Sequence, residues 1–396
     1  MTTFRVLIIG GGIGGLCLAQ GLKKSGISVA LFERGNSVAA SRQGFGFHVN
    51  ADGSSALRDC LPENLYALIL ATSTKPADGM FALLSPQLKT KFSKPLPAAS
   101  TSFGVNRQTL REILLDGLED VVRFDADFDR FEQHPDGRII AHFADRTSAI
   151  GDLLVGADGF RSPVRSQLLP DAGFDDLGRA IYGRTPLTRE LLDWLPPVMV
   201  DGMPRIVSPD GISLGVAAFR KREPFGEATS RLAPGLLLTD TPDYLRWTVS
   251  AWEAKLSATG KSFWGADGPE LLRAAAEMVQ EWHPALRRLI DEADASATLP
   301  VGIFCARPVE PWDTPNVTLL GDAIHTMTPG RGEGANTTMR DAALLTRMLT
   351  QAVEAGGSLV DAKMRYEAEM LRYGFEAAAT SRNPFFAQAV AAARKS

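Results

Sequence analysis

The chain has 396 residues, of which 45% are hydrophobic and 22% charged, as in a globular protein with a substantial core. Its formal net charge of −4 gives no electrostatic reason to expect nucleic acid or an anionic membrane as a partner. Three scattered cysteines without a CxxC pair argue against a disulfide framework or a zinc site, and no stretch is long and apolar enough to span a bilayer.

The N-terminal stretch FRVLIIGGGIGGLCLAQGLKKSGISVALFER predicts a strand, a tight turn, a helix and a second strand. Residues 4–9 form a short apolar run suited to a buried parallel strand, and apolar residues recur at helical spacing over 13–22. Two lysines favour the end of that helix, and Gly26 can take the left-handed position that follows it. Residues 28–32 form the second strand.

The turn between these elements carries the dinucleotide-binding pattern GxGxxG. Its first glycine permits the turn, the second lets a pyrophosphate approach the backbone, and the third lets the helix pack on the strand. Glu33 ends the second strand, where a carboxylate can accept both hydroxyls of an adenosine ribose and would repel a 2′-phosphate. The alternative is a glycine-rich turn that binds nothing. The cofactor contacts expected in this unit are Gly10, Gly12, Ile13, Gly14, Gly15, Glu33 and Arg34.

Two later segments argue for a ligand longer than NAD. In GDLLVGADGFRSPVR, residues 153–155 predict a short buried strand, and Asp158 lies in the glycine turn at its end. Asp158 could be a plain turn residue, but its place after an apolar strand favours a ligand contact. In NVTLLGDAIH, residues 317–320 predict another strand that ends in Gly321 and Asp322. A ligand that reaches both this turn and the N-terminal glycines must lie across the sheet.

A glycine loop at residues 330–334 precedes a helix that we expect to begin near Ala335 or Asn336. Its glycines leave backbone amides free, and the helix N-terminus directs a partial positive charge at whatever occupies the loop. We expect a flavin ring at this position. The cofactor contacts expected at this helix start are Gly334, Ala335 and Asn336.

Taken in order, GGGIGG with Glu33, DLLVGADGFRSPVR and VTLLGDAIHTMTPGRGEGANTTMRDA resemble the FAD-dependent aromatic-ring hydroxylases. These are single-component flavoprotein monooxygenases of the para-hydroxybenzoate and salicylate hydroxylase type. The resemblance spans nearly the whole chain and is loose over about 182–298, where such enzymes hold their substrate. It implies an α/β fold with a Rossmann-like FAD-binding domain, a second, sheet-based substrate domain and C-terminal helices. We expect a discontinuous FAD domain of residues 1–73, 101–178 and 300–396, and a substrate domain of residues 74–100 and 179–299.

The resemblance also implies roles for single residues. Asp322 would hold the ribityl chain, Glu33 the adenosine ribose, and Asp158 would lie near the pyrophosphate and serve NAD(P)H use. Arg107 in VNRQTLREILL resembles a family R-x-x-L contact and should reach the phosphate or ribityl side. Its alternative is an exposed arginine at a helix start. Arg42, before GFGFHVN, matches a family arginine near the cofactor.

The resemblance puts Pro329 and the following glycines, Gly332 among them, beside the flavin ring as part of the catalytic centre. The chain departs from the family pattern in this loop. The usual Gly-x-Gly-Gln-Gly is here Gly-Arg-Gly-Glu-Gly, so the loop shape is retained while Arg331 and Glu333 change the charge beside the flavin. His325 completes the family's GDAxH, and we expect a structural hydrogen bond there rather than a catalytic base. None of the five histidines has metal-ligand spacing, so no metal site is expected.

The substrate side is less clearly marked. GFGFHVN predicts a strand whose phenylalanines face the core, which would leave His48 on the substrate side, where it could polarise a phenol hydroxyl. A structural histidine is an equal alternative. Phe219 and Tyr182 are weaker pocket candidates, because aromatic residues there more often pack in the core.

The family resemblance implies FAD as cofactor, NADH or NADPH as a transient co-substrate, and O2 and a phenolic or polycyclic aromatic small molecule as substrates. Oxygen transfer would pass through a flavin C4a-hydroperoxide, with the helix after Gly334 stabilising the anionic reduced flavin. Alternatives are an epoxidase or other oxidoreductase of the same fold, or a non-catalytic flavin-binding regulator. A halogenase is disfavoured, because WTVSAW has the wrong spacing for its WxWxIP motif. We expect a cytoplasmic monomer or homodimer without stable membrane insertion.

Overall fold

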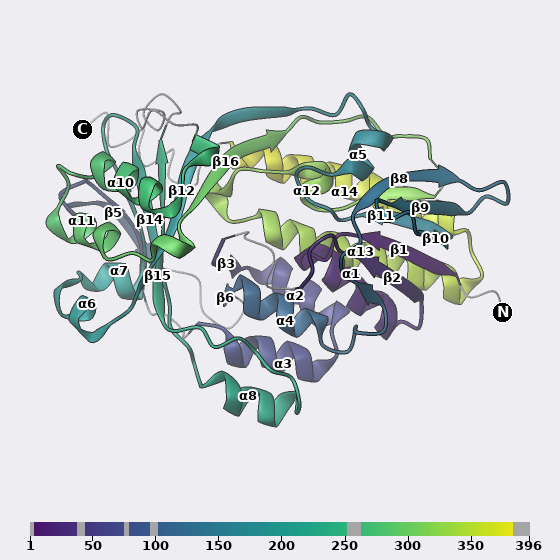
Figure 1. Ribbon diagram of the computed structural model, residues 1–396, viewed down its shortest axis with the longest axis horizontal. Coiled ribbons are helices and arrows are strands. Elements are labelled where there is room, and N and C mark those ends of the chain that lie inside the picture. Colours follow the sequence, from purple (N-terminus) through teal and green to yellow (C-terminus); the bar gives the residue numbers. More distant parts are fainter. Residues whose placement is uncertain are drawn as a thin grey trace.

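The computed structural model describes residues 4–37, 44–74, 79–95, 102–251, 263–314 and 316–382. Arg42, expected near the cofactor, lies outside these ranges. The described chain is elongated, with a helix-rich half that holds a parallel sheet and a second half built on a larger sheet (Figure 1). No helix in these ranges is both long enough and apolar enough to cross a membrane.

A five-stranded parallel sheet forms the centre of the first half. Its strands come from distant parts of the chain, and the inner ones are apolar and buried, as a sheet covered on both faces requires. The carboxyl ends of these strands meet at one edge. In spatial order the strands are β17 (Val317–Leu319), β11 (Leu153–Gly156), β1 (Arg5–Ile9), β2 (Ser28–Phe32) and β7 (Val122–Arg123).

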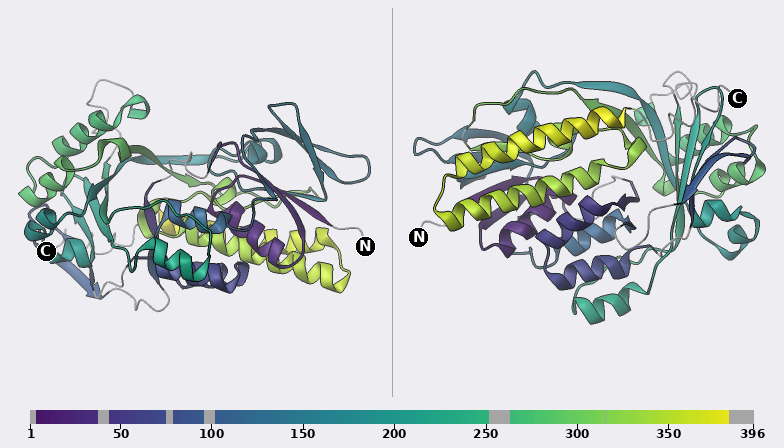
Figure 2. Two further views of the ribbon diagram at one scale, coloured as in Figure 1. Left: turned by 60° about the horizontal axis from the view of Figure 1, so that its bottom comes forward. Right: turned by 180° about the vertical axis from the view of Figure 1, so that it is seen from behind.

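Helices cover this sheet and supply the larger hydrophobic core. The two longest, α13 (Gly334–Ala355) and α14 (Leu359–Ser381), lie side by side, as the rear view in Figure 2 shows. Helix α13 also packs against the helix that follows the glycine turn. The other helices of this half are α1 (Ile13–Lys24), α2 (Ala51–Cys60), α3 (Glu63–Thr72), α4 (Arg107–Leu115), α5 (Pro163–Leu168), α8 (Phe225–Leu232) and α12 (Asp322–His325).

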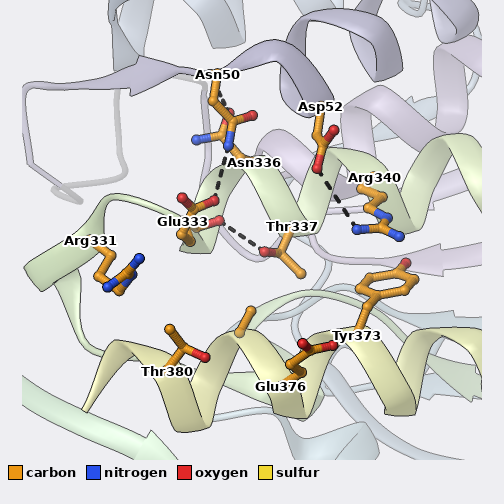
Figure 3. A pocket seen from close by; sticks show the side chains of 11 residues that line it. Asn50, Asp52, Arg331, Glu333, Asn336, Thr337, Arg340, Tyr373, Glu376 and Thr380 are labelled. Atoms are coloured by element: carbon orange, nitrogen blue, oxygen red, sulfur yellow. Dashed lines mark hydrogen bonds and ion pairs between the residues drawn. The ribbon is translucent and has the colours of Figure 1, made fainter. Parts of the chain in front are cut away.

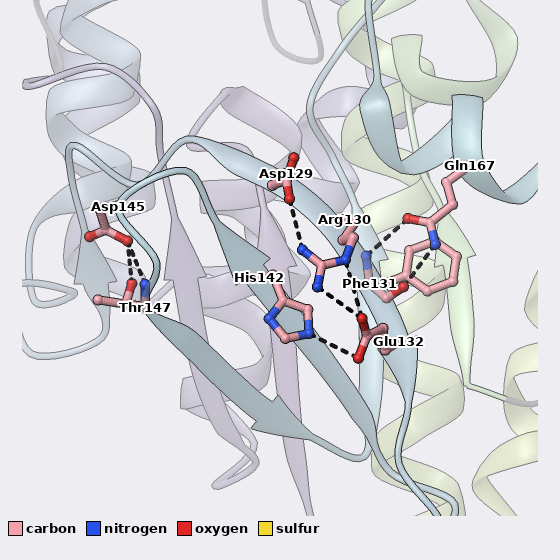
Figure 4. Close-up of polar contacts among 8 residues, drawn as sticks. All are labelled: Asp129, Arg130, Phe131, Glu132, His142, Asp145, Thr147 and Gln167. Atoms are coloured by element: carbon pink, nitrogen blue, oxygen red, sulfur yellow. Dashed lines mark hydrogen bonds and ion pairs between the residues drawn. The ribbon is translucent and has the colours of Figure 1, made fainter.

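Two small antiparallel sheets complete this half. One pairs β3 (Gly46–Val49) with β6 (Phe103–Asn106), and it lies near the second half. The other contains β8 (Phe128–Gln133), β9 (Ile139–Phe143) and β10 (Ser148–Gly151). Its outer face carries an exposed network in which Arg130 contacts Asp129 and Glu132 at 2.9 Å (Figure 4). Exposed ion pairs contribute little stability, so we assign this sheet no role at the site.

The second half is a seven-stranded mixed sheet. Its one face packs on short helices over a separate hydrophobic core, and its other face looks toward the parallel-sheet half (Figure 1). Helices over the first face are α6 (Arg189–Trp194), α7 (Pro197–Asp201), α10 (Gly268–Met278) and α11 (Pro284–Asp291). In spatial order the strands are β16 (Leu299–Ala306), β12 (Phe174–Pro186), β15 (Tyr244–Ala251), β14 (Ser213–Phe219), β13 (Met203–Val207), β4 (Met80–Leu84) and β5 (Thr90–Pro95).

The fold class expected from the sequence is confirmed: a Rossmann-like α/β unit is joined to a sheet-based unit and ends in long helices. The hairpin of β4 and β5 joins the large sheet, although more than 80 residues separate it from most of that sheet in the sequence. The limits at which the chain divides into two domains stay a prediction.

Candidate active site

The N-terminal glycine turn leaves space for a ligand only because it lacks side chains. A Cβ at Gly10 would lie 2.4 Å from the carbonyl oxygen of Ala157, and one at Gly15 would lie 2.0 Å from the carbonyl oxygen of Gly10. Gly12 precedes the first residue of α1, and no side chain caps that helix. The first amides of α1 are therefore available to an anion such as a pyrophosphate.

Glu33 lies beside this turn, whereas Gly14 is directed toward α13. The Glu33 carboxylate accepts hydrogen bonds from the backbone N–H of Gly11 at 2.7 Å and of Gly35 at 2.8 Å, so it is held at the end of β2 beside the turn. Gly14 instead faces α13, since a Cβ there would lie 2.4 Å from Cγ2 of Thr338. Arg34, also expected at the cofactor, has an exposed side chain.

Asp158 lies beside the same turn. A Cβ at Gly10 would lie 2.8 Å from its Cα atom. Its Oδ2 accepts a 3.3 Å hydrogen bond from Val164 N–H, while its buried Oδ1 has no hydrogen-bond partner within the described residues. Burial raises the pKa of Asp158 to about 6, although Ser162 and other donors oppose the increase. This carboxyl therefore changes its protonation state close to neutral pH, and it lies at the edge of the sheet where ligands bind.

The turn after β17 brings Asp322 to the same edge from the other end of the chain. Its side chain is open to solvent, yet enough protein surrounds it that burial raises its pKa, against the charges of Arg107 and His325. We call the space beside Asp322 the cofactor groove, because we expect the ribityl chain of FAD to lie there. Arg107 lies at the start of α4, and its charge acts directly on Asp322, which agrees with the predicted approach to the ribityl side.

The glycine loop has the expected shape. Pro329 begins a short 3-10 turn, Gly332 takes a left-handed φ of 71°, and α13 begins at Gly334, one residue before the predicted start. Asn336 is 2% exposed and uses its side chain within the protein. It donates to the carbonyl oxygens of His48 and Gly332, both at 2.9 Å, and thereby ties the loop to β3. Its expected cofactor contact would have to come from the backbone.

A cavity of about 300 Å³ adjoins this loop, between the first turns of α13 and the last turns of α14 (Figure 3). Its lining is polar and carries both signs of charge. Glu333 borders it and accepts a 2.9 Å hydrogen bond from Asn50; burial raises the pKa of this glutamate. Other lining residues shown in Figure 3 are Asp52, Arg331, Thr337, Arg340, Tyr373, Glu376 and Thr380.

The large sheet presents basic and aromatic side chains toward the cofactor groove. Strand register puts Tyr182 opposite Thr248, and Arg205 lies two strands farther along the same row. Arg246 occupies the adjacent row. Residues on the other face alternate with these and are buried in the helix-covered core. The face toward the groove therefore carries Tyr182, Arg205, Arg246 and, paired with Arg246, Arg184.

These side chains lie close to the groove residues. The charges of Arg107, Arg205 and Arg246 all act on the Tyr182 hydroxyl, whose pKa burial raises. His48 is on β3, and its Nε2 is hydrogen-bonded to the Ser102 hydroxyl. Burial, followed by the charge of Arg246, lowers the pKa of His48 to about 4, so its imidazole is neutral near pH 7. His48 and Tyr182 are therefore both influenced by the charge of Arg246.

Phe219 is placed differently. It is 3% exposed and stacks on Tyr244 with ring centroids 5.3 Å apart. These two rings form a small apolar cluster with Phe225, so the packing alternative describes Phe219 better than the substrate contact. Alternation puts Phe219 on the same face as Gly215, four residues earlier on β14, and at the end of that strand its ring packs on Tyr244.

Three arginines at the site were not predicted. Arg111 follows Arg107 by one helical turn on α4, and its guanidinium donates to the carbonyl oxygen of Gly11 at 2.8 and 3.2 Å. Spacing of four residues in the helix could have indicated it. Arg205 and Arg246 lie on strands whose alternate positions are apolar, a pattern that marks a polar face without showing what that face meets.

A parallel sheet with a glycine turn at one end of the chain and an acidic turn at the other, facing a second sheet, defines a flavoprotein that holds an extended dinucleotide. Residues 276–380 match the model of the FAD binding domain, and residues 8–59 match the NAD(P)-binding Rossmann-like domain. The glycine turn and the uncapped N-terminus of α1 fit the pyrophosphate of FAD, and Asp322 fits its ribityl chain.

Comparison with known proteins identifies the family. The chain is 30% identical to the aurachin C monooxygenase/isomerase of Stigmatella aurantiaca, over 93% of this chain and 85% of that protein. It is 32% identical to an FAD containing monooxygenase of known structure from Photorhabdus luminescens, with 96% of each chain covered and a TM-score of 0.83. It is 35% identical to the dual O-methyltransferase/FAD-dependent monooxygenase elcB of Phaeosphaeria nodorum, covering 87% of this chain but 40% of that longer protein.

The chain therefore belongs to the FAD-dependent monooxygenases, an enzyme family, and FAD is its cofactor. This confirms the family that the sequence motifs predicted. The individual cofactor contacts named above stay predictions.

Proposed function

We propose that this chain uses NAD(P)H and O2 to hydroxylate an aromatic small molecule that carries an ionised group, either a phenolate or a carboxylate. The observation that carries the proposal is Arg246. Within the described part of the chain, its guanidinium has no hydrogen-bond or ion-pair partner, and burial lowers its pKa. Its neighbour across the strand pair, Arg184, is by contrast matched by Asp294 at 3.0 Å. An enclosed cation without an acid is best stabilised by an anionic ligand.

Neighbouring groups suit the same ligand. Arg205 and Arg107 add positive charge around Tyr182, and the Tyr182 hydroxyl can donate a hydrogen bond to an anionic oxygen. An ionised ring oxygen also makes an aromatic ring more electron-rich, which favours attack on an electrophilic oxygen. Positive charge in the site therefore both binds the substrate and keeps it in its reactive form.

His48 is suited to orient a phenol hydroxyl. An imidazole whose pKa is lowered to about 4 is neutral near pH 7 and can accept a hydrogen bond from that hydroxyl, but it is too weak a base to hold the proton. Its contact with the Ser102 hydroxyl holds the ring in place. Arg246 acts on His48 as well, so substrate anion and imidazole would both lie within reach of one guanidinium.

Bound FAD supplies the redox chemistry and the activation of O2. The protein contributes the rest. The N-terminus of α13 would stabilise negative charge at the ring, Asp322 and Arg107 would hold the ribityl side, and the glycine turn with α1 would hold the pyrophosphate. The large sheet excludes water from the ring and orients the substrate. The sequence has one GxGxxG pattern, so we propose that NAD(P)H docks transiently.

The test is substrate-stimulated oxidation of NADH and NADPH in air, with product analysis, across matched pairs of anionic and neutral aromatics such as acids and their methyl esters. We expect anionic members to stimulate oxidation and to gain one oxygen atom. Arg246→Met should raise KM for anionic substrates by about 10- to 100-fold, because a charged hydrogen bond contributes about 1.5–3 kcal/mol, and change KM for neutral ones far less.

Arg287→Met is the matched control, because Arg287 lies on α11 on the far side of the sheet and its side chain is 48% exposed. Arg287→Met should leave KM unchanged for anionic and for neutral substrates. Equal KM values for acids and esters in the wild type would refute the anionic class. Flavin reduction without any stimulation by the panel would favour a non-catalytic flavin-binding regulator, and an epoxide product would favour the epoxidase alternative.

A further inference from the structure

Asp341, in α13, is fully buried and uses both carboxylate oxygens. Its Oδ2 accepts a hydrogen bond from Gly321 N–H at 2.8 Å and lies 2.7 Å from His325 Nε2; its Oδ1 accepts one from the Tyr373 hydroxyl at 2.6 Å. A carboxylate only accepts, so Nε2 carries the hydrogen in that contact. Burying a carboxylate is costly unless several donors surround it, and here three do.

The three donors come from three segments. Gly321 belongs to the turn that presents Asp322, His325 ends α12, and Tyr373 lies on α14. Asp341 itself lies about two turns into the helix whose first turn closes the glycine loop. The Asp341 carboxylate therefore connects the turn that carries Asp322 to α13, the helix that we expect to face the flavin ring.

Gly321 is held in a conformation that few other residues adopt. Its φ is 64°, and a Cβ would lie 2.7 Å from Thr338 Oγ1 on α13. The glycine lets the turn approach α13 closely, and its N–H then meets Asp341. Asp322 follows immediately, so the direction of its side chain depends on this contact.

The pKa of His325 reflects this arrangement. Burial alone would lower its pKa, but the charge of Asp341, their hydrogen bond and the charge of Asp322 outweigh burial and raise the pKa. The Asp341 carboxylate therefore favours the protonated form of His325, and their hydrogen bond ties the end of α12 to α13. His325 thus has the structural hydrogen bond expected from the sequence, and Asp341 is the partner that the sequence did not reveal.

We propose that Asp341 is a positioning residue that holds the Asp322 turn and the N-terminal turn of α13 at one fixed spacing, so that both bind the same FAD molecule. Loss of its charge would release Gly321 and His325 together. The Asp322 turn and the N-terminal turn of α13 would then no longer keep the spacing at which both contact one FAD molecule. Cofactor affinity would fall although Asp341 itself lies away from the groove.

Tyr373 marks the outer end of this arrangement. Its pKa is raised, first by burial and then by the charge of Asp341, so the hydroxyl stays protonated and donates. Its ring lies 3.9 Å from the guanidinium carbon of Arg340 and lines the cavity in Figure 3. Tyr373→Phe removes one donor from Oδ1 and leaves the Gly321 and His325 contacts in place, which makes it a graded version of the main test.

The experiment measures FAD affinity of the apoprotein by quenching of flavin fluorescence, together with thermal unfolding of the apoprotein. Asp341→Asn should weaken FAD binding by about 10- to 100-fold, as expected for loss of a charged hydrogen bond. Glu367→Gln is the control, because Glu367 belongs to another buried ion pair, 2.9 Å from Lys363 Nζ on α14. It should lower the unfolding temperature and leave FAD affinity within about twofold.

A double-mutant cycle separates positioning from general stability. If Asp341 acts through Asp322, Asp341→Asn should weaken FAD binding by less than about threefold when Asp322 is already alanine. Additive effects, or an Asp341→Asn variant that binds FAD as the wild type does, would overturn the proposal. If Asp341→Asn does not fold, Tyr373→Phe decides: a three- to tenfold loss of FAD affinity, an order-of-magnitude figure for one neutral donor, supports positioning, and unchanged affinity overturns it.

Discussion

Asp158 offers a prediction whose sign and size follow from its surroundings. Burial raises its pKa from 3.8 in the unfolded chain to about 6 in the folded apoprotein. The folded state therefore binds a proton that the unfolded state has lost between these two values. Stability is greatest below the unfolded pKa and falls as pH rises through the folded pKa, because the carboxylate must then ionise while one oxygen is buried without a partner.

The magnitude follows from the difference between the two pKa values. At about 1.4 kcal/mol for each pKa unit, a group that moves from 3.8 to about 6 destabilises the apoprotein by about 2 kcal/mol at pH 7 relative to pH 4, where the unfolded carboxyl is already partly ionised. Asp158→Asn cannot ionise. The stability of the variant relative to the wild type should therefore increase by about 2 kcal/mol across that range.

The assay is urea unfolding of the apoprotein of both forms at several pH values between about 4 and about 8, followed by circular dichroism. The apoprotein is used because bound FAD would shift stability by mass action. Subtracting the wild-type curve removes the contributions of all other titrating groups. If the difference between the two proteins stays constant with pH, Asp158 does not titrate near neutrality and the argument from its buried oxygen is wrong.

Two further predictions concern the groove. Asp322→Ala should lose FAD during purification, because the ribityl chain would lose its proposed carboxylate partner; a yellow, fully loaded variant would contradict that placement. His48→Ala should lower the hydroxylation rate by about 10-fold, as expected for loss of one hydrogen bond that orients the substrate, and reduce coupling of NAD(P)H use to product. An unchanged rate and coupling would leave His48 with only its structural contact to Ser102.

Those parts of the site that depend on neighbours in sequence were predictable. Gly10 and Gly332 have the positive φ values that their turns require, and Gly26 takes the left-handed position after α1. The strands before Asp158 and Asp322 are short and apolar because they are buried on both faces. Motif order then indicated that the two ends of the chain meet, and the parallel pairing of β11 with β17 and β1 brings them together.

What faces the flavin from the other side could not be read in the same way. The register of β12, β13 and β15 decides that Tyr182, Arg205 and Arg246 share one face, and a slip of one residue would turn each away. Phe219 lies on that same face, at the end of β14, where it packs in an apolar cluster. Strand periodicity predicts two faces and does not tell which one meets a ligand.

The sequence by itself determined the cofactor, because glycine turns and strand ends are local features whose conformations follow from a few adjacent residues. The tertiary structure decided which charges gather on one face of the large sheet and which residues meet Asp341, because both depend on contacts between residues far apart in the chain. Gly321, His325 and Tyr373 meet Asp341 only after three helices and a turn have packed together.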